Sequence, residues 1–237
     1  MIPLRACGAG RNLPLLGYDI EHRYRWPLVT LVLIALAALA ASAVSLLSGF
    51  GLGTVLLPVF ALFLPLPVAV GATAVVHLAS NAAKLLLMAR HARAPVVLRF
   101  GIPAAFAALG GAALLGWIDR IPPLGAYAIG GRVFEIVAVK ALIGSLMIAF
   151  AVLELLPRAA SASVPARWMP LGGLLSGFFG GLSGHQGALR SMFLLRAGLT
   201  KEQFVATGVV CAAMVDVARL SVYGPGVFRQ PDRKAHV

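Results

Sequence analysis

Charged residues are scarce in this sequence, and acidic ones are the scarcest. Only 12% of the 237 residues are charged, and 8 Asp and Glu stand against 20 Lys and Arg. Hydrophobic residues supply 60% of the chain, and the mean hydropathy is +0.92. Too little polar surface is left for a soluble globule of this length. We therefore expect an integral membrane protein that faces a lipid bilayer.

Cysteine is rare, and catalytic motifs are missing. Cys7 and Cys211 are poorly placed to pair, and they give no metal-ligand spacing. The sequence shows no nucleophile with a base, no metal cluster and no phosphate-binding P-loop. We therefore expect no cofactor, no ATP-driven transport by this chain and no enzyme. An intramembrane enzyme that uses His185 and Asp216 is the most distant alternative.

The formal net charge of +12 does not indicate a nucleic-acid partner. Lys and Arg lie in short clusters between apolar segments, and such clusters are typical of topology signals and of contacts with anionic lipid head groups. Ala41-Ser42-Ala43 resembles a signal-peptide cleavage site. The apolar run continues beyond it to Leu47, so we expect an uncleaved helix.

The apolar segments predict the helices. An uninterrupted run at 27–47 is long enough to cross a bilayer about 30 Å thick. The segment 54–64 contains Pro58 and is too short to cross, so it predicts a half-helix. The remaining apolar segments are 68–89, 100–118, 136–156, 169–182, a second half-helix at 188–197, and 203–223. Gly110, Gly111 and Gly116 in the segment 100–118 suit close helix packing.

An internal repeat of 135 residues runs through the chain. The shift carries Ser48-Gly49-Phe50-Gly51-Leu52-Gly53 onto Ser183-Gly184-His185-Gln186-Gly187-Ala188. It also carries Asn81 onto Asp216 and Lys84 onto Arg219. Paired glycine-rich breaks, each followed by a polar residue and a cation inside an apolar run, are typical of duplicated transporters.

The predicted fold is all-α: a polytopic integral membrane protein with two tandem repeats, each with a Gly-rich break and a half-helix. We divide the chain into a basic tail (1–26), a first repeat (27–118), a linker loop with a connecting helix (119–161), a second repeat (162–226) and a polar tail (227–237). The helix 100–118 has no counterpart in the second repeat. Either this repeat is naturally short, or the sequence is incomplete at its C-terminus.

Basic loops predict the topology. If the short segments enter and leave on one side, the N-terminus, Arg90–Arg99, Pro157–Arg167 and the C-terminus share a side. That side carries most of the arginines, so the positive-inside rule makes it cytoplasmic, and Asp119–Glu135 lies outside. If the short segments cross fully, the two repeats are inverted and the basic clusters are divided between the sides. We favour the first arrangement.

The two Gly-rich breaks are the candidate anion site. Glycines allow the backbone to leave helical geometry, and the half-helix that follows offers unpaired N–H groups and a positive dipole end. The candidate residues are Ser48, Gly49, Gly51 and Gly53 in the first break, and Ser183, Gly184, His185, Gln186 and Gly187 in the second. The alternative is that these glycines only allow helices to pack closely.

Cations inside apolar segments complete the candidate site. Lys84 has neutral Asn81 three residues earlier, whereas Arg219 has Asp216 at that spacing. A cation near mid-helix costs about 2.5–3.5 kcal/mol on insertion scales, so it usually faces a cavity or a partner. Alternatively, both cations snorkel to the interface. Arg190, in the second half-helix, suits bidentate binding of an oxyanion.

Two histidines lie in apolar segments. His185 stands in the second break beside Gln186, where it is suited to hydrogen-bond a substrate or carry a coupled proton. We expect His77 to be a packed, hydrogen-bonded helix residue.

The motifs around Leu47–Pro58 and Gly177–Leu195 resemble the TauE/SafE sulfite-exporter family of membrane permeases. Gly49, Gly51, Gly53 and Pro58 match the family pattern, whereas His185 and Gln186 interrupt the second cluster and Phe193 replaces its proline. The resemblance covers residues 27–223. It implies passage of small sulfur-containing or organic anions, such as sulfite or sulfonates, across the bacterial inner membrane.

The sequence thus predicts a multi-pass secondary transporter of the cell inner membrane. Its expected partners are a small anionic substrate and the lipid bilayer. The sequence does not decide whether the protein forms a homo-oligomer. The alternative function is a non-transporting membrane scaffold or assembly factor, whose polar residues only join helices.

Overall fold

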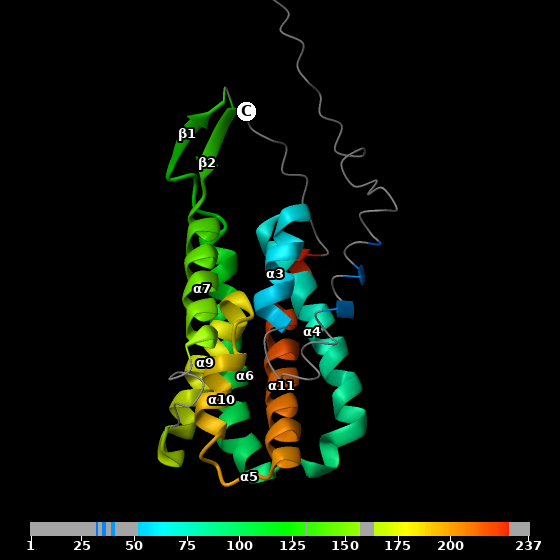
Figure 1. The fold of residues 1–237 in the computed structure, drawn as a ribbon. Coiled ribbons are helices and arrows are strands. Elements are labelled where there is room, and N and C mark those ends of the chain that lie inside the picture. Colours follow the sequence, from blue (N-terminus) through cyan, green and yellow to red (C-terminus); the bar gives the residue numbers. More distant parts are fainter. Residues whose placement is uncertain are drawn as a thin grey trace, which may run out of the picture.

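A computed structural model describes residues 32, 35, 36, 39, 40, 52–130, 132–156 and 164–227 (Figure 1). This part of the chain is mostly helical. Ser48, Gly49 and Gly51 of the first break lie outside it, as do the sequence that resembles a cleavage site and most of the segment 27–47.

The helices begin and end within a few residues of the apolar segments. They are α3 (Leu52–Phe63), α4 (Leu66–Met88), α6 (Ile102–Ile118), α7 (Ala138–Leu155), α9 (Met169–Ser183), α10 (Gly187–Leu194) and α11 (Lys201–Val227). Short helical turns connect them: η1 (Ala89–His91), α5 (Ala94–Val96), the π-helical η2 (Val97–Gly101) and η3 (Ala166–Trp168). Proline occupies the first or second position of α4, α6 and α9, where its missing N–H costs no helical hydrogen bond.

The linker between α6 and α7 corrects the all-α expectation. It forms an antiparallel hairpin of β1 (Gly125–Ile129) and β2 (Arg132–Ile136), with Tyr127 paired to Phe134. These two rings stack with centroids 5.5 Å apart. Aromatic and β-branched residues favour strands, and Gly130 takes the left-handed conformation (φ 59°) that a tight hairpin turn needs.

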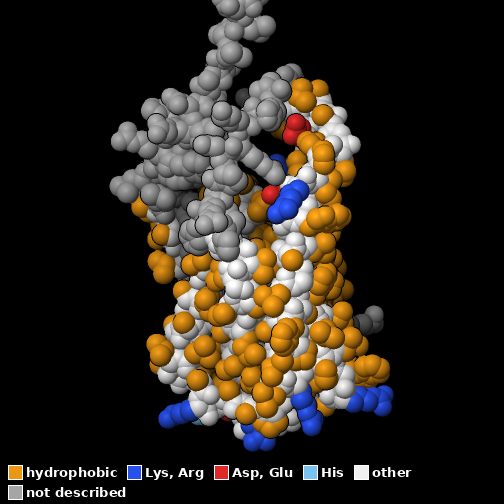
Figure 2. Space-filling view, turned by 180° about the vertical axis from the view of Figure 1, so that it is seen from behind, with side chains coloured by type: hydrophobic (Ala, Val, Ile, Leu, Met, Phe, Trp, Pro, Cys, Tyr) orange, Lys and Arg blue, Asp and Glu red, His pale blue; other side chains and the backbone are white. Residues whose placement is uncertain are grey.

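Within the part of the chain that the structure describes, three helical stretches are long and apolar enough to cross a membrane: Leu66–His91, Ala94–Ile118 and Lys201–Gly224. Ala138–Leu153 is a shorter apolar helix. Large hydrophobic side chains such as Leu86, Phe106 and Ile148 are exposed on the outer faces. Figure 2 shows the hydrophobic side chains spread over the sides of the bundle, with Lys and Arg gathered at the end where α4 finishes. This distribution suits a protein with lipid around its sides.

Helices α9 and α10 form a re-entrant hairpin. Gly184 (φ 84°) ends α9, and the chain then turns back toward the end at which α9 began (Figure 1). The N–H of Val164, before α9, donates to the carbonyl of Met192 in α10 at 3.2 Å. At 15 residues, or about 22 Å, α9 is too short for the full crossing that the predicted topology assigned to 169–182.

This hairpin reverses the predicted side of the last helix. The N–H of Arg93, just after α4, donates to Thr207 Oγ1 near the start of α11 at 3.0 Å. Tyr223, near the other end of α11, packs with Leu115 and Val139 beside the β hairpin. The segments 68–89 and 203–223 are therefore antiparallel, and the placement of the C-terminal end of 203–223 on the side of Arg90–Arg99 was wrong.

Glycines bring α6 and α9 into backbone contact. A Cβ at Gly173, Gly177 or Gly181 would overlap the carbonyl group of Phe100, Ala104 or Ala108, respectively. Of the glycines predicted for close packing, Gly111 faces the Phe178 carbonyl. A Cβ added at Gly110 or Gly116 would have no neighbouring atom within 4 Å. The close contact is therefore one stripe of α9 against one face of α6.

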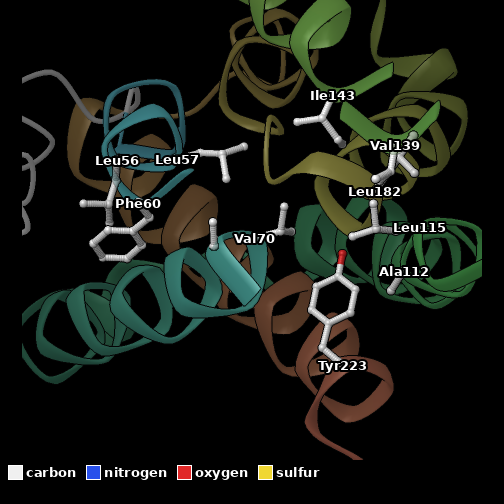
Figure 3. Packing of buried hydrophobic residues seen from close by; sticks show 11 residues of the cluster. Leu56, Leu57, Phe60, Val70, Ala112, Leu115, Val139, Ile143, Leu182 and Tyr223 are labelled. Atoms are coloured by element: carbon white, nitrogen blue, oxygen red, sulfur yellow. The ribbon is translucent and has the colours of Figure 1, made fainter. Parts of the chain in front are cut away.

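The largest apolar cluster lies toward the β-hairpin end. Figure 3 shows Leu57, Val70, Ile143, Leu182 and Leu115 pointing toward a common centre from different helices. The Tyr223 hydroxyl donates a hydrogen bond to the Gly181 carbonyl, so α11 is joined to α9 beside this cluster.

Gly177→Ala should destabilise the protein, because the new methyl group must push α6 away from α9. We expect a loss of about 1–3 kcal/mol, typical of overpacking, seen as a lower melting temperature in detergent. Gly110→Ala adds the same methyl group to α6 in open space and should not lower the melting temperature. Equal melting temperatures for the two variants would contradict this packing.

Cysteine labelling should place Arg93 and the β hairpin on opposite sides of the membrane. In a background without Cys7 and Cys211, an impermeant thiol reagent added to intact cells should label Ala126→Cys and spare Arg93→Cys. Permeabilised cells provide the control, because both cysteines should then react. Labelling of both positions in intact cells would refute this topology.

Candidate functional site

A polar cluster is buried where α4, α9, α10 and α11 meet. Most of the predicted site residues that the structure describes lie within it. Its buried members are Asn81, Lys84, Ser183, His185, Gln186, Arg190, Asp216 and Arg219. Gly184 lies in the link between α9 and α10, Gly187 begins α10, and Gly53 lies near the start of α3.

Asp216 is the hub of this cluster. Its Oδ1 accepts hydrogen bonds from Arg219 Nε at 3.0 Å and from Arg219 Nη2 at 2.7 Å. Its Oδ2 accepts from Asn81 Nδ2 at 3.0 Å and lies 2.6 Å from His77 Nδ1. Residues of α4 therefore satisfy one oxygen and a residue of α11 satisfies the other. A buried carboxylate requires such complete pairing.

Arg219 does not snorkel to the surface. Its exposed fraction is 0%, and its Nη1 donates to the Gly180 carbonyl in α9 at 3.3 Å. A Cβ at Gly184 would lie 2.8 Å from Nη1. Two features therefore require glycine at position 184: its backbone is left-handed, and a side chain there would collide with Arg219. Lys84 is also buried, so the snorkelling alternative fails for both cations.

Hydrogen bonds hold the link between α9 and α10. The Ser176 hydroxyl donates to the Gln186 carbonyl at 3.0 Å, and the Ser183 hydroxyl donates to the Phe179 carbonyl at 3.1 Å. His185 Nδ1 lies 3.1 Å from the same Ser183 oxygen, and its ring stacks on Phe150 of α7 with centroids 5.5 Å apart. These contacts hold the backbone of the link and the His185 ring in place.

Polar atoms at the start of α10 have no such partners. Arg190 Nη1, Gln186 Nε2 and His185 Nε2 are buried and make no hydrogen bond within the part of the chain that the structure describes. Arg190 lies against Gly208, where an added Cβ would be 3.5 Å from its Nε. Buried donors usually have partners, so these three atoms mark where a ligand is expected.

The charge balance of the cluster is positive. Lys84, Arg190 and Arg219 are buried with one carboxylate, Asp216, so the four groups carry a net charge of +2 when ionised. Lys84 and Arg190 are close enough to repel each other. Unbalanced charge in an apolar interior is costly, and an anion would offset it.

His77 is the contact residue that the predicted site omitted. As expected, it is a hydrogen-bonded helix residue; its shortest contact is with Asp216 of α11, and Asn81 of its own helix lies 3.1 Å from the same ring nitrogen. Asn81 lies one turn after His77 on α4, and the 135-residue shift pairs Asn81 with Asp216. This i, i+4 spacing, which puts both side chains on one face, was the available signal.

Fold and site define an α-helical membrane protein with a buried, cation-rich cluster beside a broken helix. Residues 34–233 match the family described as Sulfite exporter TauE/SafE, and the chain belongs to that family. The match confirms the resemblance seen in the glycine motifs, and the membership indicates a membrane transporter of the sulfite or anion type. No curated protein and no solved structure matches the chain.

Asp216→Asn should strongly destabilise the protein, because it leaves the Arg219 charge buried without a counter-ion. We expect a loss of about 3–5 kcal/mol, measured by unfolding in detergent micelles. Glu202→Gln removes a charge from an exposed position of the same helix and should leave the free energy of unfolding almost unchanged. The double variant Asp216→Asn/Arg219→Met should recover much of the loss. If Asp216→Asn is as stable as Glu202→Gln, the ion pair between Asp216 and Arg219 is disproved.

Proposed function

We propose that this protein is a secondary transporter that moves a small sulfur oxyanion, such as sulfite or a sulfonate, across the bacterial inner membrane. The observation that carries the proposal is Arg190, a buried arginine with one unpartnered terminal nitrogen among the described residues. It lies in the first turn of α10, where the helix N-terminus adds positive potential.

We propose two roles for the predicted site residues. Asn81 and Arg219 have their donors committed to Asp216 or Gly180, so they shape the site. Arg190, Gln186 and His185 still offer buried nitrogens, and they form the proposed binding surface. Lys84 contributes positive charge beside Arg190. A guanidinium fork, an amide and an imidazole together suit the separate oxygens of a sulfite or sulfonate group.

The internal repeat supports transport rather than a static scaffold. Helices α3 and α10 begin at Leu52 and Gly187, and α4 and α11 begin at Leu66 and Lys201. Both pairs are 135 residues apart. Because α4 and α11 run antiparallel, we propose inverted repeats, which transporters use for alternating access around a shared site. Ser48, Gly49, Gly51 and Gly53 would then supply the corresponding break in the first repeat.

Reconstituted protein tests this function directly. Proteoliposomes should take up radiolabelled sulfite with saturable kinetics, and methanesulfonate should compete. Liposomes without protein and liposomes with Arg190→Gln should show only leakage. If the wild type shows no saturable flux with sulfite, methanesulfonate or acetate, transport is refuted and the scaffold reading gains support.

Arg190→Lys should weaken anion binding because it keeps the charge and loses the fork. Apparent affinity should fall about tenfold or more, equivalent to about 1.4 kcal/mol, and Arg190→Gln should nearly abolish transport. The measurement is the rise in melting temperature that matched sulfite concentrations produce. Arg196→Lys, an exposed arginine just after α10, should keep the wild-type rise. If sulfite raises the melting temperature of wild type, Arg190→Lys and Arg196→Lys equally, Arg190 does not belong to the site.

A further inference from the structure

We propose that an apolar groove on the outside of the bundle holds an acyl chain of an anionic phospholipid, whose phosphate lies beside Arg93 and Arg99. The groove is separate from the anion site, so the inference does not depend on the proposed function. The sequence predicted only general contacts between basic loops and lipid head groups. The structure assigns one lipid to one face of the protein.

Three helices form the groove, which has a volume of about 540 Å³. All of its lining side chains are apolar. They come from α4 (Leu85), from α6 (Phe106 and Leu109 among them) and from α11 (within 210–218). Ala213 of α11 is nearly buried, whereas Phe106 and Leu109 are exposed at the rim. Such a groove accepts a hydrocarbon chain and offers no hydrogen bond to a polar ligand.

The groove runs along α11. The α11 side chains that line it are spaced at i, i+3, i+4, i+7 and i+8 from Val210, so they share one face of the helix. Thr207, one turn earlier, continues this face. From Thr207 to Ala218 the helix rises about 16 Å, which is close to half of a hydrocarbon layer about 30 Å thick. The groove therefore lies within one leaflet and follows the direction of its acyl chains.

Two arginines lie at the end of the groove where α4 finishes. The N–H of Arg93 donates to Thr207 Oγ1 at 3.0 Å, so the chain between α4 and α6 covers the continuation of this α11 face. Arg99 precedes Phe106 by seven residues, or about two helical turns. Both arginines are exposed, and neither forms an ion pair with another described residue. The phosphate of a lipid whose chain lies in the groove would stand at this level, where a guanidinium binds it well.

The charge at this end favours an anionic head group (Figure 2). One exposed acid, Glu202, stands among the exposed cations Arg90, Arg93, Arg99, Arg167, Arg196 and Lys201. A basic residue near an anionic membrane surface strengthens binding about fivefold. A zwitterionic lipid has the same phosphate and chains but no net charge, so we expect it to bind more weakly.

A second copy of the chain suits this groove less well. Two copies in one membrane have the same orientation, and a two-fold pair joined through the groove would place their basic ends side by side. The exposed cations there far outnumber Glu202, so the two ends would repel each other. An anionic lipid brings the opposite charge to the same place.

The test uses photoreactive lipids in phosphatidylcholine nanodiscs that contain the whole chain. One lipid is phosphatidylglycerol with a diazirine on an acyl chain, and the other is phosphatidylcholine with the same chain. Mass spectrometry locates the cross-links. Phosphatidylglycerol should label Met214 and Val217 about 25-fold more than phosphatidylcholine does, because two arginines act at about fivefold each. Ile148, exposed on α7, should react equally with both lipids.

Variants separate the head group from the chain. Arg93→Gln/Arg99→Gln should remove most of the preference for phosphatidylglycerol. Arg167→Gln/Arg196→Gln removes two charges from the same end, next to α9 and α10, and should keep most of it. Ala105→Phe fills the groove and should lower the labelling of Val217. Ala149→Phe, at an exposed position of α7, should leave it unchanged.

The wild-type comparison decides the proposal even where a variant fails to insert. Equal labelling of the groove by the two lipids would show ordinary bulk lipid there and would overturn the site. Labelling of Ile148 without labelling of Met214 or Val217 would show that protein covers the groove, and it would overturn the site as well. Neither result bears on sulfite transport, which the proteoliposomes measure separately.

Discussion

The buried carboxylate of Asp216 is the constraint around which the interior is arranged. An ionised group in an apolar bundle is stable only if each oxygen has donors. Here α4 supplies two nitrogens and α11 supplies two more. Because Arg219 also reaches the Gly180 carbonyl, the same pair determines where α9 ends. One charge therefore fixes the relative positions of three helices.

A second consequence concerns which cations remain available. Arg219 and Arg190 are both buried, yet the first is saturated by protein groups and the second is not. Helix position alone would not distinguish them. The distinction follows from their neighbours, since Arg219 has a carboxylate one turn earlier on its own helix. The arginine with a buried, unpartnered nitrogen among the described residues therefore lies on the shorter helix, α10.

Much of the helical fold could be predicted from the sequence because lipid imposes long apolar segments. The bounds of α4, α9, α10 and α11 lie close to the predicted segments, and the Asp216–Arg219 pair follows from i, i+3 spacing. The hairpin of β1 and β2 was missed because it lies outside the hydrophobic pattern. The predicted membrane side of the C-terminal end of α11 was wrong. The count of basic residues cannot show whether a segment of 15 residues, such as α9, crosses the membrane or turns back. Contacts across helices, such as His77 with Asp216, depend on helix rotation, which no local pattern specifies.

The re-entrant hairpin also changes the electrical thickness of the protein. Helix α10 has eight residues, a length of about 12 Å, whereas the hydrocarbon layer is about 30 Å thick. The link at Gly184–Gln186 therefore lies inside this layer, at a depth from the arginine-rich end between the length of α10 and that of α9, which is about 22 Å. If water fills the remaining depth on the other side, the membrane voltage falls across this short insulating segment alone. The local field would then be stronger than that across an intact bilayer, and it would act directly on a charge held beside α10.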